Sequence, residues 1–488
     1  MGETQMKNIE ADVVVIGAGG AGIPAALSAV ENGAESVIVL EKRKTVGGNA
    51  VFANGIFACE SLIQRRAMID APKDEIYKKA MAWHRYSSRI NPRILRAYIN
   101  KSGDTISWLM KRGIEFEIGA QWRLNYHQNP CWHVIKGHTP LGRFAPVVKS
   151  LTDECREKGV QILLETTGEK VLRGSEGEVV GVIAVQDGQK FEIKTKSVII
   201  TTGGFMGNKE LLNKFFPFYD ESFGGLVVPH EGDGIQLAAE AGGALDDVAT
   251  LVREHGLTFT KDHSLGQAAR QPNAIWVNKK GQRFLDEASA EQSQICSNAI
   301  IRQPGKVAYA VYDEQMIEEV MEKGWFLPHA PIRPIPSDLK EILQNEVANG
   351  GEVKISDNWD EIARWIGAEP NVLKATITEY NSFCDHGYDE DFVKERRFLA
   401  PLCKAPYYVI KFGVLLIETI GPVRINHNME IIDKNDDPIP GLYAAGVLSG
   451  GWLSDDYCGE YLFGSALSYS VNSGRIAGEN ASLYIKEK

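Results

Sequence analysis

The sequence predicts an α/β protein that begins with a Rossmann-like nucleotide-binding unit. A short β-branched run, DVVVI at residues 12–16, is typical of a strand that is buried on both faces of a parallel sheet. A glycine-rich turn at residues 17–22 follows, and then a helix-favouring stretch with Pro24 in its first turn. Glycine is also frequent along the whole chain, at 48 of 488 residues, whereas about 7 % is typical. Strand, glycine turn and helix in this order indicate a Rossmann-like fold.

The turn GAGGAG at residues 17–22 matches the GxGxxG pattern of dinucleotide-binding sites. In this pattern Gly17 makes the tight turn, Gly19 lets a pyrophosphate approach the backbone, and Gly22 lets the helix pack against the strand. A second strand at residues 36–40 ends in Glu41, where an acid accepts hydrogen bonds from a ribose diol. Because an acid at this position disfavours a 2′-phosphate, we expect a dinucleotide other than NADP in this pocket.

The composition argues against several other classes of protein. There are 53 Lys and Arg residues against 64 Asp and Glu, a formal net charge of −11, which does not favour a nucleic-acid surface. The seven cysteines are scattered without a CxxC pair, so a disulfide scaffold, a zinc ribbon, a c-type haem site and an iron–sulfur run are disfavoured, and no metal site is expected.

An uncharged run at residues 13–30 resembles a membrane span only at first sight. It contains four glycines and Pro24 and changes its period midway, so it indicates a buried strand, a turn and the start of a helix. The polar N-terminal residues show no signal-peptide pattern. We therefore expect a cytoplasmic protein with reduced thiols and no transmembrane segment.

Further glycine-bearing segments carry a family resemblance. They are KRKTVGGNA at 42–50 with NGI at 54–56, SVIITTGGF at 197–205, GDG at 232–234 with AGGA at 241–244, and GLYAAG at 441–446 with GRIAG at 474–478. Through these segments the chain resembles the flavoproteins of the fumarate reductase and succinate dehydrogenase family, over essentially its whole length and in the same order. The resemblance implies an FAD cofactor.

The same resemblance implies a GR2-type, Rossmann-like FAD-binding domain made from two pieces, residues 1–250 and 418–488. An α+β substrate-capping domain at residues 251–417 would be inserted between them, and GQRFLDE at 281–287 is similar to a family motif in that region. Arg283 of this motif is expected to be structural. Helical spacing at 313–322, 338–347 and 372–383 agrees with such a domain. The active site would be the cleft between the flavin ring and the cap.

The motifs also imply which residues contact FAD. Covalent members of the family attach the flavin through a histidine after the GGN segment, but residues 49–59 contain none, so we expect non-covalent FAD. Val447 stands where the family often has a glutamate. The expected cofactor-binding residues are Gly17, Ala18, Gly19, Ala21, Gly22, Glu41, Lys42, Gly47, Gly48, Asn49, Ala50, Asn54, Gly55, Ile56, Val171, Thr202, Gly203, Asp233, Gly446, Ser465, Ala466 and Leu467.

Positions that bind dicarboxylates in fumarate reductases carry other residues in this chain. The family's proton-donating arginine falls on Glu291, the histidine of its HTMGG motif on Glu418, and the arginine of its NRLGGNA motif on Tyr461. Two ionised, partly buried acids would repel a dianion. Fumarate and succinate are therefore not expected as substrates.

The candidate catalytic residues are Tyr461, Tyr457, Glu418, Arg253 and His255. The two tyrosines precede the last helix in an arrangement similar to that of the 3-ketosteroid dehydrogenases, in which a tyrosine polarises a ketone. A tyrosine hydroxyl can donate a hydrogen bond to a developing enolate. Alternatively, both tyrosines are wall residues packed against the flavin ring. Arg253 and His255 fall near a substrate-binding histidine of the family, or are ordinary surface charges.

These features predict an FAD-dependent oxidoreductase that acts on a C–C or C=C bond next to an activating group. Hydride would move between flavin N5 and the β-carbon, while a tyrosine or an acid moves the proton. The expected substrate is an apolar or phenolic ring compound such as a steroid enone or an isoflavonoid, and reduction is favoured over dehydrogenation. Two alternatives stay open: an oxidase or dehydrogenase that passes electrons to oxygen or a quinone, and a flavin-carrying electron-transfer subunit that works with a partner. The electron donor stays open between NADH, a reduced flavin and a redox protein.

Overall fold

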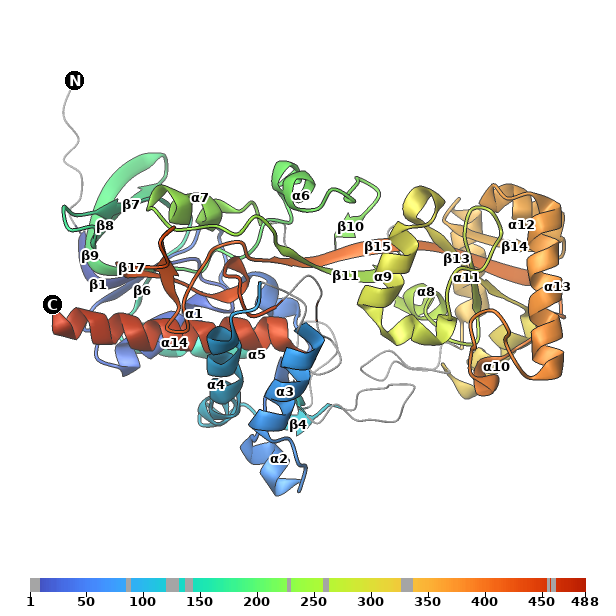
Figure 1. Cartoon of the computed structure of the whole chain (residues 1–488), viewed down its shortest axis with the longest axis horizontal. Helices are drawn as coiled ribbons and strands as arrows, with labels where there is room; N and C mark the ends of the chain where they lie inside the picture. Colours follow the sequence, from blue (N-terminus) through green and yellow to red (C-terminus); the bar gives the residue numbers. More distant parts are fainter. Residues whose placement is uncertain are drawn as a thin grey trace.

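The protein's computed structural model describes residues 9–84, 89–119, 131–136, 144–225, 230–257, 263–325, 337–453, 457 and 462–488. Two sheets lie toward opposite ends of the molecule, and a long pair of strands runs between them (Figure 1). Among the described residues, no helix combines the length and the apolar composition that a membrane crossing requires.

The larger sheet is built around the first strand, β1 (Ile9–Ile16), whose residues 13–15 are completely buried. Parallel strands flank β1 on both sides, with Val14 opposite Ile38 on one side and Val198 on the other. The sheet order is β16-β17-β9-β1-β2-β6, and the hairpin of β7 and β8 extends from β9. The bounds are β2 Val37–Leu40, β6 Gln161–Leu163, β7 Thr166–Arg173, β8 Val179–Gln186, β9 Gln189–Ile200, β16 Glu430–Ile432 and β17 Pro438–Ala444.

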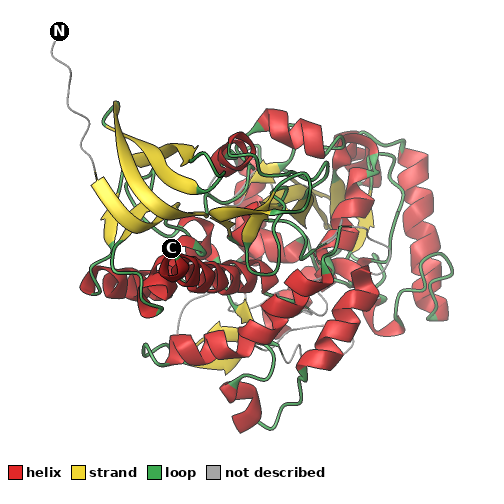
Figure 2. Ribbon diagram, turned by 60° about the vertical axis from the view of Figure 1, so that its left-hand side comes forward, coloured by secondary structure: helices red, strands yellow, loops and turns green. Residues whose placement is uncertain are grey.

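The first and last helices, α1 (Gly22–Glu31) and α14 (Ser465–Glu487), pack against each other beside this sheet (Figures 1 and 2). Glycines allow the close contact, because a Cβ at Gly474 would lie 2.2 Å from the carbonyl oxygen of Ala21. Serine hydroxyls add hydrogen bonds, such as Ser482 Oγ to Ala29 O at 2.8 Å. The uncharged run at 13–30 thus forms a strand, a turn and a helix, as its sequence indicates.

The second sheet is organised by one long strand, β15 (Tyr407–Ile420), which pairs with β13 and β14 at its start and with β11 and β10 toward its end. The sheet order is β10-β15-β13-β12. Helices α8 to α13 surround this sheet (Figure 1). The bounds are β10 Gly224–Gly225, β11 Thr250–Gly256, β12 Ile275–Val277, β13 Ala308–Tyr312, β14 Val353–Ser356, α8 His263–Ala268, α9 Ser293–Ile301, α10 Glu314–Lys323, α11 Leu339–Ala348, α12 Trp359–Ile366 and α13 Pro370–His386.

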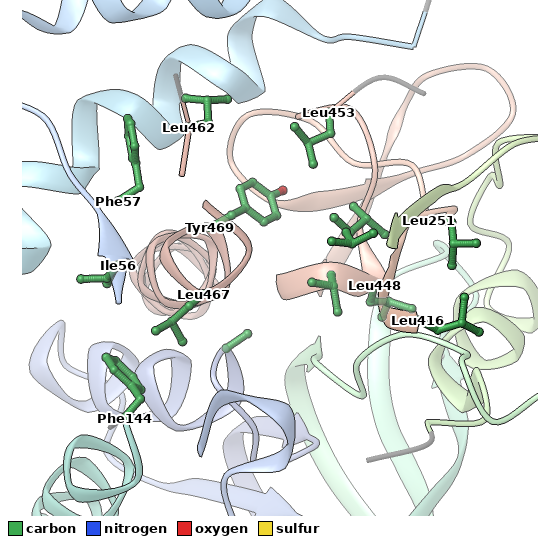
Figure 3. Close-up of a cluster of buried hydrophobic side chains, with 14 of the residues drawn as sticks. Ile56, Phe57, Phe144, Leu251, Leu416, Leu448, Leu453, Leu462, Leu467 and Tyr469 are labelled. Atoms are coloured by element: carbon green, nitrogen blue, oxygen red, sulfur yellow. The ribbon is translucent and has the colours of Figure 1, made fainter. Parts of the chain in front are cut away.

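A small sheet of order β3-β5-β4 and its neighbouring helices complete the fold. Buried apolar side chains connect this region with the beginning of α14 and with β11 and β15, as Figure 3 shows for Phe57, Leu467, Leu251 and Leu416. The bounds are β3 Ile56–Phe57, β4 Phe116–Ile118, β5 Trp132–Ile135, α2 Leu62–Arg66, α3 Lys73–His84, α4 Pro92–Met110, α5 Ala145–Glu157, α6 Lys209–Phe215 and α7 Asp233–Glu240.

Arg283 belongs to a buried ionic cluster beside the second sheet. One of its nitrogens, Nη2, lies 2.8 Å from both Glu287 Oε2 and Asp389 Oδ2, and Lys394 Nζ lies 3.2 Å from Glu287 Oε2. All four side chains are almost completely buried. Removing one partner from such a cluster typically costs about 3–5 kcal/mol, so these contacts agree with the structural role expected for Arg283.

Candidate active site

A cavity lies at the carboxyl ends of β1, β2 and β9. This edge of an open α/β sheet is where ligands bind in doubly wound folds. The walls come from distant parts of the chain: the turn after β1, the segment after β2, the start of β7, the end of β9, the end of β15 and the beginning of α14.

The glycines of the first turn have different structural roles. Gly17 has φ +105°, and a Cβ there would lie 2.6 Å from Thr201 O. A Cβ at Gly22 would lie 1.8 Å from Gly17 O, so both positions must be glycine for the turn to form. A Cβ at Gly19 would meet only Gly47 O, at 4.0 Å, and Gly19 lines the cavity. These positions agree with the roles that the GxGxxG pattern assigns to its glycines.

Glu41 stabilises the same turn from the end of β2. Its Oε2 accepts a hydrogen bond from Ala18 N at 2.9 Å, and its Oε1 accepts one from Arg43 N at 2.9 Å. The side chain also lines the cavity. Next to it, Lys42 Nζ lies 2.6 Å from Oδ2 of Asp233, the first residue of α7. This ion pair joins the β2 segment to α7 across the cavity wall.

The end of β15 brings an acid into the opposite part of the wall. A β-bulge places Val252 opposite Glu418 and Arg253 opposite Leu416, so Ile417 is the extra residue on β15. The bulge explains why Ile417 and Glu418, which are consecutive, both line the cavity.

Glu418 is buried among neutral partners. Its Oε2 accepts a hydrogen bond from Asn49 Nδ2 at 2.8 Å, and its Oε1 accepts one from Thr419 N at 3.0 Å. Burial raises the pKa of Glu418 to about 7, and these two hydrogen bonds oppose the rise only in part. The carboxyl group is therefore poised to gain or lose a proton near neutral pH.

The wall also contains polar atoms that need a ligand. Thr202 Oγ1 and His230 Nδ1 are buried and make no hydrogen bond within the described part of the chain, and both residues line the cavity. Buried polar atoms are normally hydrogen-bonded. The open space beside the Gly19 backbone, the acid after β2 and these two buried polar atoms together fit a dinucleotide such as FAD.

Most of the residues expected to contact the cofactor line this cavity, and the others are not part of its lining. Gly55 is an example of the second group, because a Cβ there would lie 2.1 Å from Trp132 Nε1, so packing requires this glycine. The expected residues that line the cavity are Gly17, Gly19, Ala21, Glu41, Lys42, Gly48, Asn49, Ala50, Thr202, Gly203, Asp233, Gly446, Ala466 and Leu467. Those outside its lining are Ala18, Gly22, Gly47, Asn54, Gly55, Ile56, Val171 and Ser465.

Sequence reasoning missed the contribution of β7 and of His230. Residues 166–168, at the start of β7, line the cavity because Thr166 N donates to Glu41 O at 2.9 Å, beside the end of β2. Val171 lies further along β7, opposite Val182 of β8. No motif marks residues 166–168. His230, in contrast, could have been found from its place three residues before Asp233 of the GDG motif.

The other catalytic candidates that the structure describes do not line the cavity. Tyr457 Oη accepts a hydrogen bond from Ala466 N, in the first turn of α14, at 3.3 Å. His255 is buried beside Trp276 and Phe412, with ring centres 5.1 Å and 6.1 Å away. Tyr461 lies outside the described residues, so its catalytic role stays a prediction from the sequence.

Arg253 is held by neighbouring elements outside the cavity lining. Its Nη2 donates to Asn298 Oδ1 of α9 at 2.6 Å, and its guanidinium carbon lies 5.1 Å from the centre of the Phe218 ring. The Arg253 side chain is buried. The alternative expectation of an ordinary surface charge therefore does not hold for this residue. Its role in substrate binding stays a prediction.

Comparisons with known proteins agree with this geometry. A family model described as "FAD binding domain" matches residues 12–454. The chain is 29% identical to the vinyl phenol reductase of Lactiplantibacillus plantarum, over 99% of both chains. It is 30% identical to the fumarate reductase (cytochrome) of Shewanella frigidimarina, covering 98% of this chain and 78% of that one. Among solved structures, the 3-ketosteroid Δ1-dehydrogenase of Sterolibacterium denitrificans has a similar fold, with a TM-score of 0.77 at 18% identity, over 97% and 99% of the two chains.

The different roles of the two glycines can be tested by binding. Gly19→Ala should keep the fold, because the added Cβ meets no close neighbour, but should weaken FAD binding at least about tenfold (~1.4 kcal/mol). Gly17→Ala should instead lower the thermal unfolding temperature, because its Cβ would clash with Thr201 O. FAD titration of the apoprotein by flavin fluorescence, with thermal unfolding in parallel, measures both effects.

The matched control is Gly266→Ala in α8. A Cβ at Gly266 would meet nothing within 4 Å, and this residue does not line the cavity. This variant should bind FAD as the unmodified chain does. Equal FAD affinity in Gly19→Ala and Gly266→Ala would contradict the role assigned to Gly19.

Proposed function

The chain belongs to the fumarate reductase and succinate dehydrogenase family of flavoproteins, defined by the FAD binding domain, and from this premise we propose that it reduces the C=C bond of a neutral phenolic or apolar ring compound. It is an FAD-dependent oxidoreductase that acts on C=C or CH–CH bonds, as its relatives are. The substrate class and the reductive direction are the proposed parts.

The observation that carries the proposal is the buried acid Glu418 on the cavity wall. Its hydrogen-bond donors, Asn49 Nδ2 and Thr419 N, are neutral, and burial raises its pKa to about 7. Fumarate carries two negative charges, which a partly ionised buried acid repels rather than binds. A phenol or an enone brings no charge and can exchange hydrogen bonds with a carboxyl group.

Bound FAD supplies the hydride-transfer chemistry. The chain's own residues position the substrate and move the proton. Glu418 holds a proton at a buried oxygen near neutral pH, which suits a general acid whose pKa matches the working pH. Tyr461 would donate a hydrogen bond to the activating group of the substrate and stabilise the charge that develops there.

A comparison also supports a phenolic substrate. The vinyl phenol reductase matches this chain from end to end, and its name describes an uncharged phenol that carries a C=C bond. The fumarate reductase of similar identity is longer, and this chain covers 78% of it. The end-to-end match and the acid at position 418 favour the same class of substrate.

The proposal is tested by offering candidate acceptors to the anaerobically reduced enzyme. The panel contains a vinylphenol, a cinnamate, an isoflavonoid, a steroid enone and fumarate, and the readout is the return of the oxidised-flavin absorbance. A neutral phenolic or enone acceptor should reoxidise the flavin at least about 100-fold faster than fumarate, a difference of ~2.7 kcal/mol. Faster reoxidation by fumarate would overturn the proposal. Rapid peroxide formation in air without any active organic acceptor would indicate an oxidase instead.

The proton-transfer roles predict specific effects of two substitutions. Glu418→Gln should lower turnover about 10²–10⁴-fold, as loss of a general acid does. The acid form of Glu418 predominates below pH 7, so kcat/KM of the unmodified enzyme should fall as the pH rises above about 7, and this decline should be absent in Glu418→Gln. Tyr461→Phe should reduce turnover by orders of magnitude while FAD stays bound. Steady-state kinetics from pH 5.5 to 8.5 measure these effects.

Glu176→Gln, on the exposed turn between β7 and β8, serves as the control for the change of a carboxylate to an amide. It should leave the pH profile unchanged. If Glu418→Gln keeps the profile of the unmodified enzyme, Glu418 does not hold the transferred proton.

We also propose that FAD is bound without a covalent bond, because residues 49–59 contain no histidine. Precipitation with trichloroacetic acid should release all of the flavin into the supernatant, measured by its absorbance. Flavin that stays with the washed protein pellet would show a covalent bond.

A further inference from the structure

His230 lies in the cavity wall and packs against two glycines, Gly203 and Gly48. A Cβ at Gly203 would lie 2.7 Å from His230 Nδ1, and a Cβ at Gly48 would lie 3.7 Å from His230 Nε2. Both glycines have positive φ, +82° and +51°. The imidazole therefore lies between the segment after β2 and the end of β9.

The backbone of His230 is anchored, whereas Nδ1 of its ring has no hydrogen-bond partner among the described residues. The carbonyl oxygen of His230 accepts a hydrogen bond from Gly207 N at 2.6 Å, which anchors the backbone of this segment. The Nδ1 atom is buried and makes no hydrogen bond to any residue that the structure describes. A buried imidazole nitrogen on a ligand cavity is most simply explained as a ligand contact.

Burial and nearby charges keep the ring neutral in the free protein. Burial, together with the positive charges of Arg43 and Lys42, lowers the pKa of His230 to about 4, while Asp233 opposes this shift. Lys42 and Arg43 follow β2, and Asp233 begins α7. From β15, Glu418 reaches the neighbouring wall positions, since a Cβ at Gly204 would lie 2.7 Å from its Oε1.

The ring also lies close to the glycine at which a diphosphate would approach the backbone. Gly48, against which the imidazole packs, is itself next to Gly19: a Cβ on Gly48 would lie 3.7 Å from Gly19 Cα. In GxGxxG sites the middle glycine faces the pyrophosphate. Lys42 and Arg43 contribute positive charge to the same part of the wall.

We propose that His230 recognises the diphosphate of FAD, donating a hydrogen bond to it and taking up a proton when the dinucleotide binds. An anion beside the imidazole favours its protonated form, so the pKa of His230 must be higher in the complex than in the free protein. A group whose pKa rises on binding makes binding tighter as the pH falls. FAD affinity should thus increase from pH 8.5 to pH 6.

The experiment measures FAD dissociation constants for the full-length chain freed of FAD, at several pH values between 6 and 8.5. The unmodified chain should bind FAD about five- to tenfold more tightly at pH 6 than at pH 8.5, and His230→Gln should show no such change. His427→Gln, at an exposed histidine before β16 that does not line the cavity, should behave like the unmodified protein. An equal pH dependence in His230→Gln would overturn the proposal.

Two further measurements identify the part of FAD that is recognised. Riboflavin lacks the diphosphate, so its dissociation constant should not change with pH as that of FAD does. An equal change for riboflavin and FAD between pH 6 and pH 8.5 would overturn the proposal. Calorimetry of the unmodified chain in buffers of different ionisation enthalpy should show net proton uptake on FAD binding near pH 6.5. Absence of uptake would overturn it even if His230→Gln fails to fold.

Discussion

The cavity depends on how closely the first helix lies against the turn that precedes it and against the last helix. A Cβ at Gly22 would lie 1.8 Å from Gly17 O, and a Cβ at Gly474 would lie 2.2 Å from Ala21 O. Any side chain at these positions would push α1 away from β1 or from α14. Because α14 packs here, Ala466 and Leu467 reach the same cavity as the first glycine turn. Two ends of a 488-residue chain thus form one site through contacts that only glycine permits.

The second constraint is the pairing of β11 with β15, by which the chain passes between the two sheets. Thr250 lies opposite Ile420 and Gly256 opposite Gly413, so the outgoing and returning segments support each other. Thr419 Oγ1 accepts a hydrogen bond from Phe205 N at 2.7 Å, which fixes the end of β15 to the segment after β9. The domain boundaries expected at 250/251 and 417/418 fall in this pair of strands, and they stay a proposal. The acid proposed to select the substrate therefore sits where the two sheets are joined.

Local patterns predicted the parts of the fold that local physics determines. The expected helices at 313–322 and 338–347 correspond to α10 and α11, because amphipathic spacing and end residues act within each segment. The wall positions of residues 166–168 and His230 depend on pairing between distant segments, which no local pattern encodes. The bulge at Ile417 likewise arises from the register of β11 on β15. The packing of the His255 ring beside Trp276 also depends on pairing between distant segments, and its role in substrate binding stays a prediction.

Burial also reverses the order in which two wall residues ionise, and this bears on the charge of the substrate. In water a glutamate loses its proton before a histidine does, but here the pKa of Glu418 is raised to about 7 and that of His230 is lowered to about 4. At a pH between these two pKa values, the Glu418 carboxyl group is protonated and the His230 imidazole is not, so both side chains are uncharged. A diphosphate that binds beside His230 would draw a proton to the imidazole and be neutralised in part. A dicarboxylate would find a carboxyl group at Glu418, so under the proposed function the wall that holds an anionic cofactor would favour an uncharged substrate.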